Sequence, residues 1–355
     1  MYISDNQSDP RFIAVFYVKA YLSDSSFEWI YTSFQIIEMV SIVLASFLNI
    51  YTVYMALSSN LFHINITTIY SAFMLHWFEL VVSRIFLYPY QEAMLPLVPK
   101  SDSLILCTFD DAIIRISSFQ NHMPLLWGGG LRARYMLLVS FALPCITMER
   151  CFATWLIRDY EKKSRVYISA SLVIMAEVLA TLAAVAVTYQ FVGVFIVAIT
   201  SATLQVASFF VMHYIKHQTK YFEQQCEQNV NFYSLSVKFQ LTENVQSFKI
   251  VHILVIQVAI MIIIVSVTIL LADIDLLSSD NTVLVFFAME KLIHVNPLLI
   301  SVAVFIVKPN WFRRLFRIIP CRLNHRTHAL EYVEQRFPHR CSQADAHFEQ
   351  LKKLW

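Results

Sequence analysis

Charged residues are scarce in this chain of 355 residues. Asp, Glu, Lys and Arg together make up 15% of it, against about 25% in an average soluble domain, while hydrophobic residues make up 57%. A water-soluble chain of this length would form two or three domains, and so few charges cannot cover their surfaces. The composition therefore predicts a membrane protein.

Glycine and paired cysteines are also scarce. Three of the four glycines are consecutive at 128–130, which argues against Gly-rich phosphate loops and glycine-gated pores. The six cysteines include no Cys-x-x-Cys pair, so neither a zinc site nor a redox motif is expected. No Ser-His-Asp order, paired hydrolytic carboxylates or His-x-x-x-His spacing stands out. We expect no enzyme activity, no cofactor, no metal and no nucleic-acid partner.

Long apolar runs fill most of the chain. A bilayer core about 30 Å thick needs about 20 helical residues. None of the runs alternates polar and apolar residues, which argues against barrel strands. Arg132 and Arg134 must snorkel outward for the third run to cross the bilayer. The predicted transmembrane segments are 34–57, 61–88, 131–157, 166–188, 193–215, 250–272 and 283–307.

The positions of Lys and Arg predict the orientation. Nineteen of these 27 residues fall on one side of the seven segments and six on the other. Basic residues favour the cytosolic side, so we expect an external amino end, with 1–33 as an extracellular tail, and a flexible cytosolic tail at 321–355. Asn6 begins a glycosylation motif on the outer tail. Cys321 is a palmitoylation candidate, or an unmodified thiol.

Ionisable side chains inside the predicted segments require partners or a watery cavity. These residues are Glu38, His76, Glu79, Arg84, Glu177, Glu290, Lys291 and His294. At 1.5 Å per residue, Glu79 and Lys291 lie roughly 26 and 24 Å from the inner side, so they are expected to pair, as are Arg84 and Glu290. With His76 and His294 they predict a polar cluster in the outer half of the bundle. It serves either as structural ion pairs that fix helix register or as a ligand site, and Glu177 has no evident partner.

The inner ends of two segments carry further polar patterns. Glu149 and Arg150 close the third segment and suggest an intramolecular lock, although any span may end in charges. Pro144 and the pair Asn296-Pro297 are candidate hinges, because proline removes a helix hydrogen bond. Residues 308–320 alternate aromatic and basic residues and predict a short interfacial helix.

Together these features describe an all-α membrane protein, a seven-transmembrane bundle like that of G-protein-coupled receptors. A transporter would more often show Gly- or Pro-interrupted helices and inverted halves. A channel would need a filter or charged ring, and neither is evident in one chain, although an oligomeric pore or a ligand-gated channel subunit stays an alternative.

The motifs also resemble a family. Met148-Glu-Arg-Cys-Phe-Ala-Thr, continued by Asp159-Tyr-Glu, is similar to the pattern that closes the third helix of nematode serpentine chemoreceptors of the epsilon class. The stretch 235–245 resembles that family's motif before the sixth helix, and Asn296-Pro297 with 308–311 resembles its seventh-helix ending.

The resemblance implies a plasma-membrane, possibly ciliary, chemosensory receptor that binds an external small molecule and couples to a heterotrimeric G protein. It places Glu149 and Arg150 at the cytosolic face. The resemblance also assigns four residues to the third inner loop, namely Phe239, Gln240, Glu243 and Asn244. Rhodopsin-like switch details do not carry over, because no Tyr follows Arg150 and Ile300 stands where such receptors have Tyr.

Overall fold

The computed structural model forms two compact units, Met1–Val307 and Lys308–Trp355, and each is described by itself. The described residues are 2–5, 9–15, 28–58, 64–92, 94–95, 97, 113–116, 118–156, 165–228, 241–242, 244–245, 247–249, 252–253, 257, 279–307 and 309–318.

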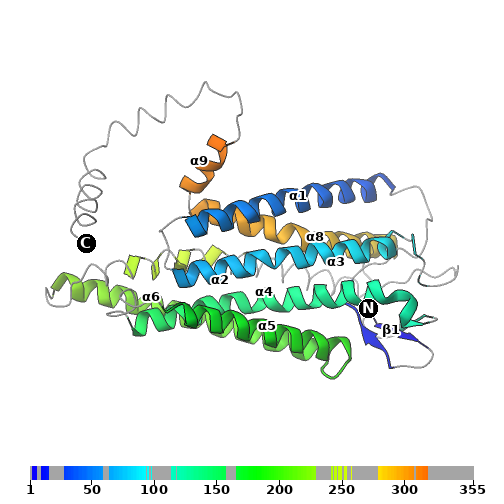
Figure 1. The fold of residues 1–355 in the computed structure, drawn as a ribbon, viewed down its shortest axis with the longest axis horizontal. Coiled ribbons are helices and arrows are strands. Elements are labelled where there is room, and N and C mark those ends of the chain that lie inside the picture. The colour runs from blue at the N-terminus through cyan, green and yellow to red at the C-terminus, as the bar shows by residue number, and fades with distance from the viewer. Residues whose placement is uncertain are drawn as a thin grey trace. The chain divides into compact units, whose positions relative to one another are not determined.

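Long helices dominate the first unit (Figure 1). They are α1 (Glu28–Ser58), α2 (Ile64–Leu75), α3 (Trp77–Gln91), α4 (Met123–Trp155), α5 (Val166–Thr188), α6 (Val194–Gln228) and α8 (Ser279–Val307). Within the described residues, six segments are long and apolar enough to cross a membrane, with α2 and α3 together forming one of them. The predicted sixth segment, 250–272, lies almost wholly outside the described residues.

Several helices extend beyond the apolar runs that predict them. Whereas α5 has the bounds of the predicted segment, α1 begins six residues earlier than predicted, α4 begins at Met123 rather than 131, and α6 continues to Gln228 rather than 215. The physical reason is that hydropathy marks only the length immersed in hydrocarbon, whereas backbone hydrogen bonding continues a helix into the polar region.

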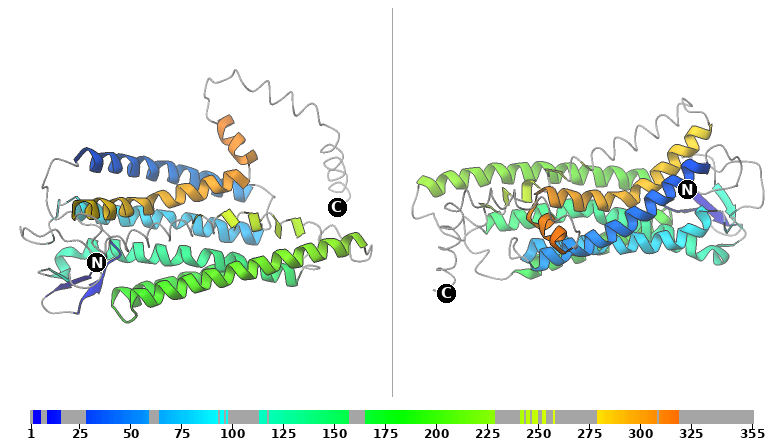
Figure 2. Two further views of the ribbon diagram at one scale, coloured as in Figure 1. Left: turned by 180° about the vertical axis from the view of Figure 1, so that it is seen from behind. Right: turned by 90° about the horizontal axis from the view of Figure 1, so that it is seen from above.

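α4 lies at the centre of the described bundle. It contacts α2, α3, α5 and α6, while α1 packs against α8 and α2 (Figures 1 and 2). Alanines at a spacing of four on α5, namely Ala176, Ala180 and Ala184, are buried. Ala176 and Ala180 pack in one cluster with Leu138 of α4 and Ile69 of α2, and such small residues allow membrane helices to approach closely.

The outward faces of the helices are apolar. In every candidate span fewer than half of the residues of the apolar stretch are buried, and in α6 only 11% of them are. Such a surface would aggregate in water and suits contact with lipid tails. Among the exposed side chains are Val40, Val43, Phe47, Met175, Leu182, Ile199, Val206 and Phe210.

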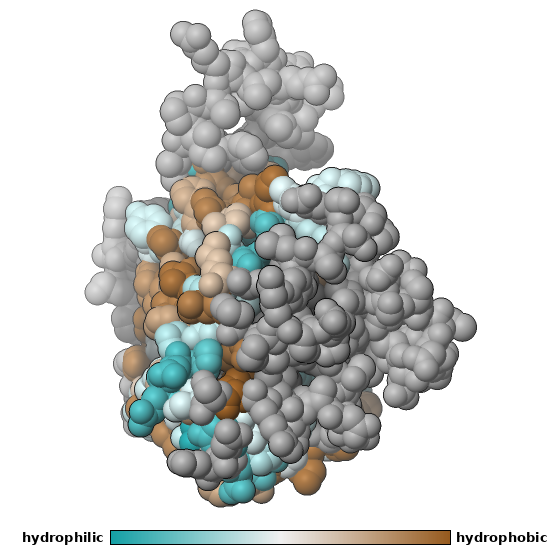
Figure 3. Space-filling view, turned by 90° about the vertical axis from the view of Figure 1, so that its right-hand side faces the viewer, coloured by the Kyte–Doolittle hydropathy of each residue, from teal (hydrophilic) through white to brown (hydrophobic). Residues whose placement is uncertain are grey.

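A small sheet lies at one end of the bundle, and the all-α expectation does not include it. β1 (Tyr2–Asp5) pairs antiparallel with β2 (Arg11–Phe12) and parallel with β3 (Ile113–Ile116). Seen from this end, the described surface has hydrophobic and hydrophilic patches side by side (Figure 3). Because β1 and β2 belong to the predicted amino-terminal tail, and Ile3 of β1 packs with Leu87 and Leu125, part of this tail is attached to the bundle.

The amino-terminal segment packs against glycines of α4. Ile13 is 1% exposed and belongs to a core cluster with Leu87 and Leu125. A Cβ atom on Gly129 would lie 2.2 Å from Ile13 Cγ2, and one on Gly128 would lie 2.8 Å from Leu87 Cγ. The glycines thus lie inside a helix, where they permit close packing, rather than before the third span as predicted.

The second unit contains α9 (Pro309–Ile318). Trp311 and Leu315 are one turn apart and lie on one face, whereas Arg313 and Arg314 are exposed. The helix is therefore amphipathic, as the pattern in 308–320 predicts.

Candidate functional site

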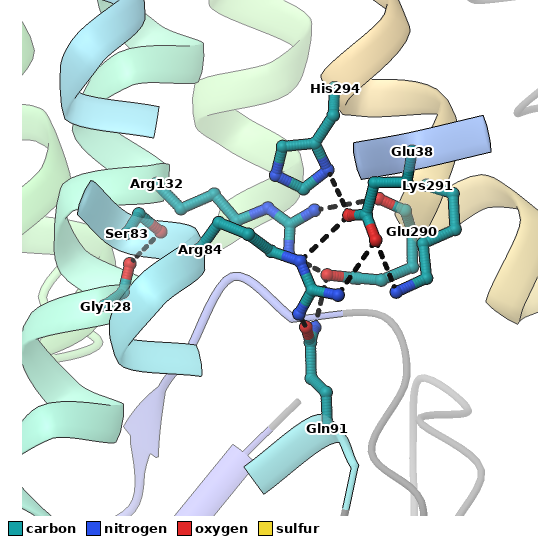
Figure 4. A network of polar contacts seen from close by, with 9 residues as sticks. All are labelled: Glu38, Ser83, Arg84, Gln91, Gly128, Arg132, Glu290, Lys291 and His294. Carbon is teal, nitrogen blue, oxygen red and sulfur yellow. Dashed lines mark hydrogen bonds and ion pairs between the residues drawn. The ribbon is translucent and has the colours of Figure 1, made fainter. Parts of the chain in front are cut away.

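A buried polar network joins four helices near the sheet end of the bundle (Figure 4). We call it the α1–α8 network, because it joins a carboxylate of α1 to charged and titratable side chains of α8. Its charged and titratable side chains are at most 5% exposed. It consists of Glu38 from α1, Arg84 and Gln91 from α3, Arg132 from α4, and Glu290, Lys291 and His294 from α8.

Glu38 is the centre of one half of the network. Arg84 donates from Nε to Glu38 Oε1 at 2.9 Å and from Nη2 to Oε2 at 2.8 Å, which is a side-on bidentate pair. Lys291 Nζ lies 2.8 Å from Oε2, and His294 Nδ1 lies 3.0 Å from Oε1. One carboxylate therefore meets an arginine, a lysine and an imidazole, which makes it the main electrostatic link between α1, α3 and α8.

Glu290 is the centre of the other half. Its Oε1 accepts from Arg132 Nη1 and, at 2.5 Å, from Gln91 Nε2. Arg132 Nη2 also donates to the Glu290 backbone oxygen at 3.2 Å. Gln91 in turn accepts from Arg84 Nη1, so this neutral amide connects the two halves.

Helix geometry positions these side chains. Arg84 and Gln91 are seven residues apart on α3, which places them on one face, two turns from each other. Ser83 donates to the Gly128 backbone oxygen at 2.7 Å and fixes α3 against α4 at the same level. Leu80 and Trp77 lie one and two turns before Arg84 on α3, and they form an apolar layer with Tyr135 of α4.

A second group surrounds His76, where the hydrogen bonding of α2 and α3 is interrupted. His76 Nδ1 lies 2.5 Å from Glu79 Oε1, and His76 Nε2 contacts Glu177 of α5. Arg134 of α4 contacts both carboxylates. We call this closed set of four side chains the His76 ring; each member is 21–23% exposed.

The structure corrects the predicted pairing. Glu79 pairs with His76 and Arg134 rather than with Lys291, whose partner is Glu38. Arg84 pairs with Glu38 and reaches Glu290 through Gln91. Depth alone cannot predict partners, because the rotation of each helix decides which of its faces meet.

Two arginines expected to snorkel outward instead lie inside the bundle. Arg132 is 1% exposed and pairs with Glu290, and Arg134 pairs with Glu177, which the sequence left without a partner. α4 begins before the glycines, so these positions fall within the helix and not at its outer end. Of the predicted cluster, Arg84, Glu290, Lys291 and His294 meet in one network, whereas His76 and Glu79 belong to the other.

A third buried group lies near the other end of α4. Arg150 donates from Nε and Nη2 to the two carboxylate oxygens of Glu149, at 2.6 and 2.8 Å, and both residues are 0% exposed. Its Nη1 donates to Asn244 Oδ1 at 3.2 Å. Asn244 Nδ2 lies within hydrogen-bonding distance of Thr154 of α4 and Thr219 of α6. We call this set the Arg150 cluster.

The candidate hinges lie within continuous helices. Pro144 is inside α4 and Pro297 inside α8. Asn296 accepts at Oδ1 from Gln257 Nε2 at 2.7 Å, so its side chain contacts a neighbouring segment. Phe239, Gln240, Glu243, Asn6 and Cys321 lie outside the described residues.

Sequence reasoning missed several members of these groups. Arg132 and Arg134 lie near the start of the predicted segment 131–157, where they are expected to snorkel outward, and Gln91 lies three residues beyond the predicted segment 61–88. A signal was available for one of them, since Glu177 has no evident partner in the sequence and Arg134 supplies the cation.

A bundle of long helices with apolar outer faces and ionised side chains paired inside it is that of a multi-span membrane protein. All residues, 1–355, match the family model described as Sre G protein-coupled chemoreceptor. The chain belongs to this family of serpentine receptors, which is a receptor family and not an enzyme family.

The relatives are proteins of Caenorhabditis elegans. Serpentine receptor class epsilon-21 is 28% identical over 247 residues, which cover 66% of this chain and 62% of the relative. The chain thus spans about three fifths of that relative's length. Class epsilon-31 is 24% identical over 90% of this chain and 91% of the relative, and class epsilon-37 is 24% identical over 92% of each. No solved structure matches the chain.

Proposed function

We propose that this protein is a seven-transmembrane chemosensory receptor that binds an external small molecule and signals to a cytosolic heterotrimeric G protein. The observation that carries the proposal is that one helix, α4, contributes a buried arginine to polar groups at both of its ends. Arg132 and Arg150 are 18 residues apart, or about 27 Å along the helix. A ligand at the α1–α8 network would therefore act on the same helix that contributes Arg150 to the Arg150 cluster.

The proposed orientation puts the α1–α8 network on the outer side and the Arg150 cluster on the cytosolic side. Basic residues support it: the exposed Arg313 and Arg314 follow α8, and Lys216, Lys220 and Arg165 lie at the same end of the bundle as the Arg150 cluster. Because Arg132 and Arg134 lie inside the bundle, the outer segments hold even fewer basic residues than the six counted from the sequence.

The Arg150 cluster has the properties of a switch. Arg150 keeps Glu149 as its partner on the same helix, while its contact with Asn244 is a single bond to a neutral amide. A hydrogen bond of this type is worth about 1.5–3 kcal/mol. That matches the 1–3 kcal/mol typical of coupling between two sites, so a ligand of ordinary affinity can shift this contact.

Movement of α8 and α4 would accompany the switch. Pro144 and Pro297 each remove one backbone hydrogen bond within a helix, and Asn296 provides a side-chain contact to Gln257 beside the second proline. In this proposal α9 lies on the inner leaflet, Cys321 is available for lipidation, Asn6 carries a glycan, and Phe239, Gln240 and Glu243 meet the G protein. The proposed site of action is the plasma membrane, with the sensory cilium as the candidate compartment.

A nucleotide-exchange assay tests the proposal. Purified receptor is reconstituted with candidate Gα subunits and βγ, and exchange is measured across a panel of small volatile and water-soluble molecules. At least one molecule should accelerate exchange in a saturable way, and Arg150→Gln should abolish that acceleration. Basal exchange that no member of a broad panel changes, with any G protein, contradicts the proposal.

A further inference from the structure

Three buried arginines in this protein allow a direct comparison. A guanidinium has a side-on edge formed by Nε and Nη2, which suits the two oxygens of a carboxylate. Arg84 places this edge on Glu38, and Arg150 places the same edge on Glu149. In both cases a carboxylate fills the edge.

Arg132 is the exception among these three. Its pairing with Glu290 Oε1 uses Nη1, at the other end of the guanidinium. Nη2 meets a backbone oxygen at 3.2 Å, and Nε has no hydrogen-bond partner among the described residues although the side chain is 1% exposed. A buried donor without a partner is costly, so the edge of Arg132 lacks the acceptor that the other two arginines have.

The α1–α8 network also has more cations than carboxylates among its described members. Its described members include three cations, Arg84, Arg132 and Lys291, and two carboxylates, Glu38 and Glu290. With a neutral His294 the formal charge is plus one. One monovalent anion would neutralise it, whereas a phosphate ester with two charges would reverse it.

We propose that the Nε–Nη2 edge of Arg132 binds the carboxylate of a small acidic ligand. The inference rests on the proposed receptor function, because it names the chemical class of the external ligand. The carboxylate would be the third acid of the network and would complete the pattern seen at Arg84 and Arg150. Apolar atoms next to the carboxylate would meet the layer formed by Trp77, Leu80 and Tyr135, which is adjacent along α3 and α4.

Gln91 is the side chain most easily exchanged when the ligand enters. It is the last residue of α3, and it is the uncharged link between Arg84 and Glu290. Releasing it breaks bonds to a neutral amide and leaves the Arg84–Glu38 and Arg132–Glu290 ion pairs intact. Entry is therefore expected from the end of the bundle that carries Gln91.

The experiment uses the full-length receptor in nanodiscs at constant chloride and ionic strength. The probes are sodium acetate, butyrate and hexanoate, each with the alcohol and the amine of the same chain length. The midpoint of thermal unfolding is followed against probe concentration, which yields an apparent Kd. At least one carboxylate should raise the midpoint in a saturable way, while its alcohol and amine should not.

Variants separate charge from geometry. Lys291→Gln brings the formal charge to zero and should weaken carboxylate binding by about tenfold or more, whereas Glu290→Gln raises the charge to plus two and should strengthen it. The double variant Arg132→Gln with Glu290→Gln keeps the charge at plus one but removes the edge, and it should lose binding. Arg134→Gln, two positions along α4 in the His76 ring, is the matched control and should keep the wild-type Kd.

Several results would overturn the inference. These are carboxylates that act no differently from their alcohols and amines, equal stabilisation by added chloride, or unchanged binding in the Arg132→Gln/Glu290→Gln variant. The proposed function is judged separately by nucleotide exchange. If a non-acidic molecule drives exchange and no carboxylate binds, the proposed function stands and the acid site is wrong. If carboxylates bind but no G protein shows exchange, the acid site stands and the proposed function is wrong.

Discussion

Replacing Glu38 by an uncharged residue of similar shape should destabilise the receptor more than such a replacement at any other position of α1. Its carboxylate contacts Arg84 twice, Lys291 once and His294 once, at 2.8–3.0 Å, and it is 1% exposed. Removing one partner of a buried ion pair typically costs about 3–5 kcal/mol, because the remaining charge stays buried. Glu38→Gln keeps the shape and one acceptor oxygen, so the lower part of that range is expected.

Thermal unfolding in detergent measures this effect. At about 2 °C per kcal/mol for a large domain, a cost of about 3–4 kcal/mol means that Glu38→Gln should lower the midpoint by about 6–8 °C. The matched control is Glu223→Gln on an exposed turn of α6, which should stay within about 0.5 kcal/mol of wild type. Combining Glu38→Gln with Arg84→Gln should cost less than the sum of the two single changes.

The reasoning is refuted if Glu38→Gln and Glu223→Gln unfold at the same temperature. Additive costs in the double variant would likewise refute the pairing of Glu38 with Arg84, because residues that interact directly are coupled.

Three further predictions concern other parts of the bundle. Gly129→Ala should displace Ile13, which a Cβ would meet at 2.2 Å, and speed proteolysis of the amino-terminal segment, whereas Gly130→Ala meets nothing within 4 Å and should leave proteolysis unchanged; equal rates in both would be inconsistent with this packing. Asn244→Ala should raise basal nucleotide exchange by roughly tenfold, because Arg150 loses a bond worth about 1.5–3 kcal/mol, and unchanged basal exchange would exclude Asn244 from the switch. Asn296→Ala should cost about 1 kcal/mol in thermal stability through the lost contact with Gln257, and a variant as stable as wild type would show that this contact contributes nothing.

The apolar runs predicted most helices because a span requires only length and hydrophobicity. α5, whose apolar run begins directly after Arg165, coincides with its predicted segment. α4 begins eight residues before its predicted segment, because the helix continues past the end of the apolar run. The sheet left no local signal, since β1 pairs in parallel with a strand more than 100 residues away.

The ionisable residues of the site could be named from the sequence, but their partners could not. Glu79 and Lys291 are expected at similar depth, yet Glu79 pairs with Arg134 of α4 whereas Lys291 pairs with Glu38 of α1. Which faces meet depends on helix rotation and on neighbours that are distant in sequence. Arg132 shows the limit most clearly, because its proposed role rests on one Nε without a hydrogen-bond partner among the described residues, which only the three-dimensional arrangement reveals.

The proposed receptor requires the two ends of α4 to face opposite compartments. Epitope tags at the amino and carboxyl termini of the full-length receptor, stained in intact and then in permeabilised cells, test this directly. The amino-terminal tag should be stained in intact cells and the carboxyl-terminal tag only after permeabilisation. Staining of the carboxyl-terminal tag in intact cells, or both tags in one compartment, would contradict the receptor orientation.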